Sequence, residues 1–450
     1  FFSSRRRHTR FLNVTGVQTC ALPISSLGIP GFGYGINYEY GLFKQKFENG
    51  YQVEQADNWL GEDSPWQFAR TDRTVTIPIG GNVEMYNKPD GKVSYVWANT
   101  RTLYGVPYDF PVVGYNGKSV NYLRLFSAKT DDELDLNIFN NGGYIEAVRD
   151  KIRTETISKV LYPSDNIEQG KELRLTQQYF FVSCAIQDII RRFMEKSNDF
   201  KKMPDYVCIQ LNDTHPALAI VEMMRQLMDV YGQEWNDAWD IVTKIFAYTN
   251  HTLLPEALEK WSSSIIRRFL PRHLQIIYEI NRRFMEFARN HFGEDSYKLG
   301  KVSIVDGEGD NQVIRMANLS IVGSFSVNGV AKLHSELVKH SLVPEFYELW
   351  PEKFTNVTNG VTPRRWMLRA NHDLSNLISD KIGTSWITDL DQLQNIEKYS
   401  DDKAFLKEFL KIKNENKRRL AQKVYRATRT MVNPDSMYIV HAKRIHEYKR

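Results

Sequence analysis

The sequence predicts an α/β fold with a largely parallel sheet and an antiparallel β insertion. From residue 171 onward, strand-like apolar runs alternate with helical patterns, and short polar turns join them. Such alternation is typical of βαβ units. Between residues 73 and 125 the hydrophobic period is two instead, which favours antiparallel strands. At 450 residues the chain is long enough for two or three domains.

The insertion is predicted from alternating apolar residues that end at turn sequences. Val75, Ile77 and Ile79 are followed by a GGN turn, and a second turn, NKPDGK, occupies residues 87 to 92. We expect antiparallel hairpins at both turns. The earlier stretch GIPGFGYG (28 to 35) is rich in glycine, but it has neither the strand nor the helix pattern of a dinucleotide site, so we expect a tight bend there.

The α/β part is predicted element by element from hydrophobic period. A helix is expected over 171 to 197 and another over 272 to 293, where Gly293 would cap its end. Strands are expected at 206 to 211 and 241 to 249, each followed by a polar turn and a helix, the second helix being EALEKW. After a strand or buried helix at 318 to 340, further helices are expected at 388 to 399 and 402 to 428, ahead of SMYIVHA and KRIHEYKR.

Composition excludes several classes of protein. The net charge of +5 depends on Arg5, Arg6, Arg7 and Arg10, because no acidic residue precedes Glu39. Without those arginines the charge is close to zero, which argues against nucleic acid as a partner. No apolar run is long enough to span a membrane. The three cysteines show neither metal-ligand nor disulfide spacing, so we expect a reducing compartment, the cytoplasm.

Residues 1 to 25 are predicted to be a non-native artefact. VTGVQTCALPI and SRRRHTR both back-translate, codon for codon, into parts of a short-read sequencing index primer, in the right order and separation. The alternative is an organellar targeting peptide, since the segment is rich in arginine and free of acids. In either case these residues are excluded from the fold prediction.

Four polar turns follow predicted strands and are the candidates for chemistry. In open α/β sheets, ligands bind at the carboxyl ends of the strands. Each turn also has a structural interpretation as a helix cap or a turn dipeptide, and we favour that interpretation for each turn considered by itself. The residues concerned are Asp213, Thr214 and His215; Asn250, His251 and Thr252; Asn359; and Lys443, Arg444, His446, Tyr448 and Lys449.

The terminal cluster KRIHEYKR is harder to explain structurally. Cations about 4 Å apart would repel one another by about 1 kcal/mol per pair in water and about 4 kcal/mol near a protein surface. Glu447 alone cannot balance them. Either the cluster is fully solvated or it holds an anion, and phosphate is the natural one. The residues alone leave these two interpretations equally open.

Long blocks of the sequence resemble the α-glucan (glycogen, starch or maltodextrin) phosphorylase family. The resemblance runs from about Leu27 to Arg450 and includes VLYPSDNIEQGKELRLTQQYF, IQLNDTHPALAI, AYTNHTLLPEALEKW, TNGVTPRRW and KRIHEYKR. It implies a glycosyltransferase-B fold of two Rossmann-like domains. Residues 26 to 360 would form part of the glucan domain, with the β insertion. Residues 361 to 450 would begin a truncated cofactor domain.

The resemblance also implies an activity. Inorganic phosphate would attack the terminal α-1,4-linked glucose of a glucan and release glucose 1-phosphate with retention, and the phosphate of pyridoxal 5'-phosphate (PLP) would act as acid and base. The matching motifs assign catalytic or phosphate-binding roles to Lys443, Arg444, Lys449 and His251. Lys443 and Lys449 would also hold the cofactor. The motifs also assign substrate contacts to Asn359, Asp213, Tyr448, Asp165 and Asn166. Arg191 and Arg192 match an effector-phosphate pair, and no metal is implied.

The family's lysine that forms the Schiff base with PLP has no counterpart in this sequence. We therefore expect the chain by itself to bind PLP poorly and to be inactive, although the family implies a homodimer at full length. Two alternatives stay open. One is a glucan-binding remnant without catalysis, and the other is a nucleotide-sugar glycosyltransferase of the same fold.

Overall fold

The computed structural model describes residues 11–14, 24–41, 43–60, 64–87, 93–131, 134–161, 167–254 and 258–440, with only the backbone for 11–14. Helices and both parallel and antiparallel sheets are present, which confirms the α/β class. The chain divides into two compact units, Phe1–Gly360 and Val361–Arg450.

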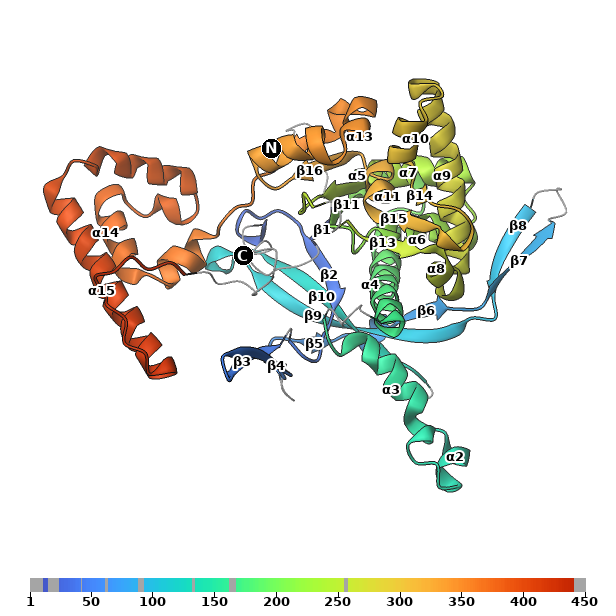
Figure 1. Cartoon of the computed structure of the whole chain (residues 1–450), viewed down its shortest axis with the longest axis horizontal. Helices are drawn as coiled ribbons and strands as arrows, with labels where there is room; N and C mark the ends of the chain where they lie inside the picture. Colours follow the sequence, from blue (N-terminus) through green and yellow to red (C-terminus); the bar gives the residue numbers. More distant parts are fainter. Residues whose placement is uncertain are drawn as a thin grey trace. The chain divides into compact units, whose positions relative to one another are not determined.

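A five-stranded parallel sheet forms the centre of the first unit (Figure 1). Its strands lie in the order β1-β11-β12-β16-β17, and all four pairings are parallel. The three central strands are mostly buried, as expected of strands with helices on both faces. The five strands are β1 Phe11–Val14, β11 Val207–Asn212, β12 Phe246–Thr249, β16 Ser326–Gly329 and β17 Phe354–Asn356.

A second, mixed sheet carries the predicted β insertion. β2 pairs with β10 in parallel, whereas β9 pairs antiparallel with β10, β5 and β6. Along β10 the buried residues alternate, so that Phe126 and Ala128 pack into the core while Ser127 and Lys129 face the other side. The bounds are β2 Phe32–Ile36, β5 Phe68–Ala69, β6 Val75–Ile79, β9 Arg101–Val113 and β10 Val120–Lys129.

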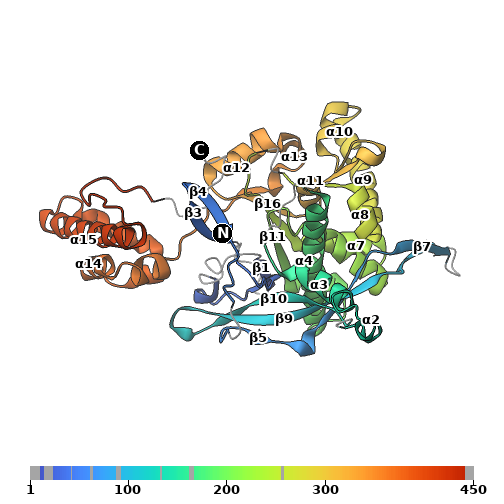
Figure 2. The same cartoon turned by 60° about the horizontal axis from the view of Figure 1, so that its bottom comes forward.

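Smaller sheets complete the β structure. The β7–β8 hairpin extends away from the body of the first unit (Figure 2). Two of these sheets have two strands each: β3 Lys44–Glu48 with β4 Tyr51–Gln55, and β7 Asn82–Asn87 with β8 Val93–Ala98. The third sheet has three strands, β13 Lys260–Ser262, β14 Val305–Asp306 and β15 Val313–Arg315.

Helices cover the sheets of the first unit. The long helix α4 contacts both the mixed sheet and α6, and Leu175, Tyr179 and Phe180 on it are fully buried. The helices are α2 Leu136–Asn140, α3 Arg149–Glu155, α4 Glu168–Met194, α5 Met203–Tyr206, α6 Leu218–Arg225, α7 Trp235–Ile245, α8 Ser263–Phe269, α9 Pro271–Phe292, α10 Ser296–Val302, α11 Met316–Val322, α12 Lys332–Leu337 and α13 Pro344–Leu349. Short helical turns are η1 Thr71–Arg73, η2 Tyr115–Gly117, η3 Glu146–Val148, η4 Thr156–Ser158, η5 Phe200–Lys202, η6 Gln226–Val230, η8 Gly309–Asn311, η9 Val338–Leu342 and η10 Pro351–Lys353.

The long periodic segments behave as predicted. The helix expected over 171 to 197 is α4, and the one expected over 272 to 293 is α9. Gly293 follows α9 with a φ of 63°, a left-handed conformation that glycine adopts at little cost. The strand expected at 206 to 211 is β11.

Four local predictions are wrong in whole or in part. The bend expected over GIPGFGYG is confined to its start, where Gly28 has a φ of 67°, because residues 32 to 36 form β2 and pair with β10. The GGN turn does not close a hairpin, since β6 pairs with β9 and β7 with β8. Residues 241 to 245 end α7 rather than begin a strand. Lys260 and Trp261 lie in β13 instead of a helix, because they pair with β15, about fifty residues away in sequence.

The second unit is helical in its described part. It contains α14 His372–Ile382 and α15 Lys403–Thr428, with shorter turns η11 Arg364–Arg369, η12 Ser385–Ile387 and η13 Leu390–Tyr399. Both predicted helices are found, the first as the 3₁₀ helix η13 and the second as α15, which Asp402 caps. Within its described part SMYIVHA forms no strand, and Met437, Ile439 and Val440 are largely exposed. No described helix has the length and hydropathy to span a membrane.

Candidate functional site

The candidate site lies where four parallel strands end. β11, β12, β16 and β17 are neighbours, so their carboxyl ends meet at one edge of the sheet. Asp213 follows β11, His251 follows β12, and Asn359 follows β17. Asn359 donates from its backbone N–H to Val330 O, just after β16, at 3.0 Å. The structure therefore brings these three predicted residues to the same edge.

A cavity of about 440 Å³ opens beside this edge. Its walls come from β2 and the segment that follows it, from α4, and from the turns after β11 and β12. Asp213 and His251 line it, together with Asn212 and His215. Asn359 is exposed and is not among the described residues that line this cavity.

His251 is oriented by Asn212. Its Nε2 lies within hydrogen-bond distance of the Asn212 side-chain oxygen. Because a carboxamide oxygen only accepts, Nε2 carries the proton and Nδ1 of the neutral ring is an acceptor. The ring can therefore accept a hydrogen bond from a hydroxyl group, which suits a polyhydroxylated ligand.

Asp213 has a strained backbone. Its φ is 67°, in the left-handed region that costs a non-glycine residue roughly 1–2 kcal/mol. Its N–H donates to Thr249 O at 3.0 Å, and its carboxylate accepts from Thr214 N at 2.7 Å. The structural interpretation of Asp213 or Thr214 as a helix cap is wrong, since α6 begins later, after Ala217, without a side-chain cap. Strain of this kind is concentrated at functional sites.

Glu259 forms a charged cluster at the wall of the cavity. Arg174 Nη2 lies 3.1 Å from Glu259, and Gln178 donates to it at 2.8 Å. Thr214 Oγ1 is 3.4 Å away, and His215 Nδ1 is 3.8 Å away, an ion-pair distance rather than a hydrogen bond. The Glu259 side chain is 10% exposed.

Burial and charge set the protonation of this cluster. Burial alone would raise the pKa of Glu259, but His215, Gln178 and Arg174 outweigh it and hold that pKa below its ordinary value. Burial alone would likewise lower the pKa of His215, but Glu259 outweighs it and raises that pKa. The cavity wall thus pairs an ionised carboxylate with a histidine that is readily protonated.

Sequence reasoning missed Glu259, Arg174 and Gln178 as site residues. Arg174 and Gln178 are four residues apart, on a face of α4 that is otherwise mostly buried. Two polar residues at that spacing in a buried helix are a signal that can be read from sequence. Glu259 gave no such signal, because EALEKW has the composition of a helix.

Arg191 and Arg192 lie in a separate cluster of arginines. A cavity of about 360 Å³ is lined there by six cationic side chains, and the sequence analysis had not assigned Arg70, Arg73 or Arg124 to it. Asp109 and Asp188 neutralise part of this charge by binding Arg124 at 2.7 and 2.8 Å. Asp188 also binds Arg191 at 2.9 Å.

The remaining predicted site residues lie outside the described residues. These are Asp165, Asn166, Lys443, Arg444, His446, Tyr448 and Lys449. Among the described residues that line the strand-end cavity there is no lysine for a Schiff base, and Arg174 is already paired with Glu259. This part of the chain does not by itself fit PLP. Nor does any described cluster of three or more His, Cys, Asp or Glu side chains suit a metal ion.

Comparison with known proteins gives consistent matches. A profile of the carbohydrate phosphorylase family matches residues 19–450. Glycogen phosphorylase of Synechocystis is 48% identical over 427 residues, which are 95% of this chain and 50% of that protein. The brain form of mouse and the muscle form of human glycogen phosphorylase are 48% and 47% identical over 435 residues, 95% of this chain and 51% of each relative. The chain therefore spans about half the length of these relatives.

Proposed function

Because the chain belongs to the carbohydrate phosphorylase family, we propose that it forms the glucan-binding side of an α-1,4-glucan phosphorylase. The bond between C1 of the terminal glucose and O4 of the next residue breaks, and a bond from C1 to a phosphate oxygen forms with retention. The O4 leaving group takes up a proton. The products are glucose 1-phosphate and a glucan shorter by one residue.

The observation that carries this proposal is the strand-end edge. Three polar turns present an oriented imidazole, a fixed carboxylate and an amide at one edge, beside the cavity. His251 Nδ1 would accept from the glucose 6-hydroxyl, with Asn359 beside it, and Asp213 would bind a hydroxyl of the same ring. Neutral and anionic acceptors of this kind suit sugar hydroxyls, which are donors.

The phosphate side of the site is proposed from the family resemblance alone. Lys443, Arg444 and Lys449 would hold the substrate phosphate and PLP, Tyr448 would approach the glucosyl hydroxyls, and Asp165 and Asn166 would gate access. PLP would supply its phosphate group as the acid and base. We propose that residues 1–450 alone do not catalyse, and that the whole protein is a cytoplasmic homodimer with two domains of glycosyltransferase-B type.

A chimera tests the reaction. The PLP half of the Synechocystis relative would be joined after Arg450, and release of glucose 1-phosphate from maltoheptaose would be followed with and without inorganic phosphate. We expect phosphate-dependent release by the chimera, none by residues 1–450, and about tenfold lower kcat/KM in the His251→Ala chimera, equivalent to about 1.4 kcal/mol.

The outcomes separate the alternatives. Retention of residues 1–450 on an amylose column, together with a chimera that folds and binds PLP but releases no sugar phosphate, would favour the glucan-binding remnant. Glucosyl transfer from a sugar nucleotide without phosphate would favour the glycosyltransferase.

The arginine cluster supports a second proposal, an effector-phosphate site. Six cations line its cavity, and the carboxylates that pair with them are fewer, namely Asp72, Asp109, Asp188 and Glu195. Arg192 lies over the Phe32 ring at 3.7 Å, which holds its guanidinium in place. Binding of adenosine monophosphate should weaken as salt rises and should fall about tenfold or more in Arg192→Gln. Equal binding by the variant would contradict the proposal.

A further inference from the structure

A second, larger pocket lies on the mixed sheet, away from the strand-end cavity. Its volume is about 710 Å³, within the range of about 300–1,000 Å³ that is typical of small-molecule sites. On β10 it is lined by Ser127, Ala128 and Lys129, and the side chains of Ser127 and Lys129 lie opposite the core-facing Phe126. The pocket and the strand-end cavity share no lining residue.

One short segment separates the two cavities. Ile36 and Tyr38 line the strand-end cavity, whereas Asn37 and Glu39 line the pocket. This alternation is that of an extended chain, whose side chains point to opposite sides.

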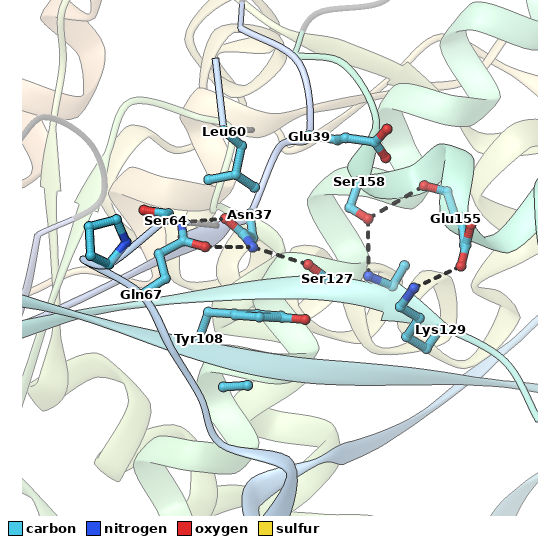
Figure 3. A pocket seen from close by; sticks show the side chains of 13 residues that line it. Asn37, Glu39, Leu60, Ser64, Gln67, Tyr108, Ser127, Lys129, Glu155 and Ser158 are labelled. Carbon is cyan, nitrogen blue, oxygen red and sulfur yellow. Dashed lines mark hydrogen bonds and ion pairs between the residues drawn. The ribbon is translucent and has the colours of Figure 1, made fainter. Parts of the chain in front are cut away.

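The amide groups of the pocket are held in place before any ligand arrives. Asn37 is only 5% exposed, and its side chain exchanges hydrogen bonds with Gln67 at 3.0 and 3.5 Å. It also donates to Ser127 Oγ at 3.3 Å. Figure 3 shows these three side chains turned toward one another, with Tyr108 beside them on β9.

The charges of the pocket are neutralised within it and at its rim. Lys129 Nζ binds Glu155 at 2.7 Å, and Lys159 binds Glu39. Burial would raise the pKa of Glu155, but Lys129 outweighs it and lowers that pKa, so the carboxylate is ionised. Ser158 accepts from Ala128 N at 3.1 Å and holds the same wall to β10.

These features restrict the ligand. The carboxylates of Glu39 and Glu155 disfavour binding of an anionic ligand, and the lysines paired with them disfavour binding of a cationic one. A wholly apolar ligand would bury the fixed amides and charges without partners. What fits is a neutral molecule with many hydroxyls, which amides and carboxylates can bind while the Tyr108 ring packs against its apolar face.

We propose that this pocket binds a neutral pyranose ring, as an accessory sugar site separate from the strand-end cavity. The proposal does not depend on the phosphorolysis reaction, because it is argued from the pocket alone. It predicts two independent sugar sites on residues 1–450.

The test is titration of residues 1–450 with maltotriose, followed by saturation-transfer NMR and calorimetry. Tyr108→Leu and Lys129→Met change the pocket, and His251→Ala changes the strand-end cavity. Tyr104→Leu is the matched control, since Tyr104 lies on the same strand and face as Tyr108 but does not line the pocket. Thermal midpoints would confirm that each variant is folded.

We expect maltotriose binding that is biphasic in the unchanged protein and in Tyr104→Leu. Tyr108→Leu should weaken one phase about fivefold or more, the size expected for loss of an aromatic contact, and His251→Ala should weaken the other phase only. Unchanged binding in both folded pocket variants would overturn the proposal. So would binding of glycine or inorganic phosphate, but not of maltotriose, at the pocket. Loss of the His251-dependent phase alone bears on the proposed function and not on this site.

Discussion

Two glutamates of this molecule each meet an arginine and a histidine, yet their surroundings differ. Glu222 is fully buried and accepts from Arg225 at 2.8 Å, from His273 at 2.7 Å and from Ser183 and Gln226. Glu259 has contacts of 2.8 to 3.8 Å, and its partners Arg174, Gln178 and His215 line the strand-end cavity. The first cluster is closed off from solvent, whereas Arg174, Gln178 and His215 of the second cluster line a cavity.

The comparison shows that residue type does not distinguish a structural cluster from a site. The pKa values do differ. Burial lowers the pKa of His273 despite Glu222, whereas Glu259 outweighs burial and raises the pKa of His215. The two Glu–Arg–His trios therefore differ in their exposure to a cavity, and on that ground we propose the Glu259 cluster as the functional one.

The largest expected effect is in the closed cluster. Glu222→Gln leaves the Arg225 charge unpaired in the core, so we expect a loss of about 3–5 kcal/mol of stability. Glu279→Gln is the control, because Glu279 likewise binds two basic side chains, Arg282 and Arg283, but lies nearer the surface, so its loss should cost about 1 kcal/mol or less. Urea unfolding would measure both. Similar losses in the two variants would refute the distinction between buried and exposed clusters.

A smaller loss is expected at the open cluster. Glu259→Gln keeps the shape of the side chain but removes the charge that binds Arg174, which should cost about 1–3 kcal/mol. Maltotriose affinity of the strand-end cavity should also fall, since His215 and Arg174 are no longer held. Calorimetry on the folded variant would detect this, and unchanged affinity would show that the cluster is structural only.

The two histidines should give pH effects of opposite sign. The pKa of His215 is raised, so its stabilisation is fully present below the unfolded pKa of about 6.5 and is lost as pH rises through the folded value. The pKa of His273 is lowered, so stability is instead lost as pH falls below about 6.5. NMR titration of ¹³C-labelled histidines would measure both pKa values. The same direction of shift in both would contradict the comparison.

The smallest stability effect is expected for Asp213→Gly. Glycine adopts the left-handed φ without strain, which offsets the lost hydrogen bond to Thr214 and the gain in unfolded-state entropy. We expect a net change within about 1 kcal/mol, but about tenfold weaker maltotriose binding if the carboxylate contacts the sugar. A large loss of stability with unchanged binding would assign Asp213 a purely structural role.

Sequence patterns predicted correctly that three candidate residues lie at one edge of the sheet. Asp213, His251 and Asn359 follow apolar runs, and the parallel topology places such turns at one edge. The assignment of 1 to 25 as non-native and the domain limits stay predictions, as do the roles of residues outside the described ranges.

What sequence could not predict depends on distant pairing. Glu259 contacts the cavity-lining Arg174 and Gln178 from immediately before β13, where Lys260 and Trp261 pair with β15 against their local helical composition. The arginine cluster joins Arg70 to Arg124 through Asp109, and the pocket beside Asn37 combines five separate segments. No local period reports such contacts.

The most direct measurement of the central claim is a crystal structure of residues 1–450 grown with maltotriose. We predict a terminal glucose ring at the strand-end edge, with a hydroxyl within about 3 Å of His251 Nδ1 and another at the Asp213 carboxylate. Sugar density elsewhere, with this cavity filled only by water at saturating maltotriose, would contradict the account.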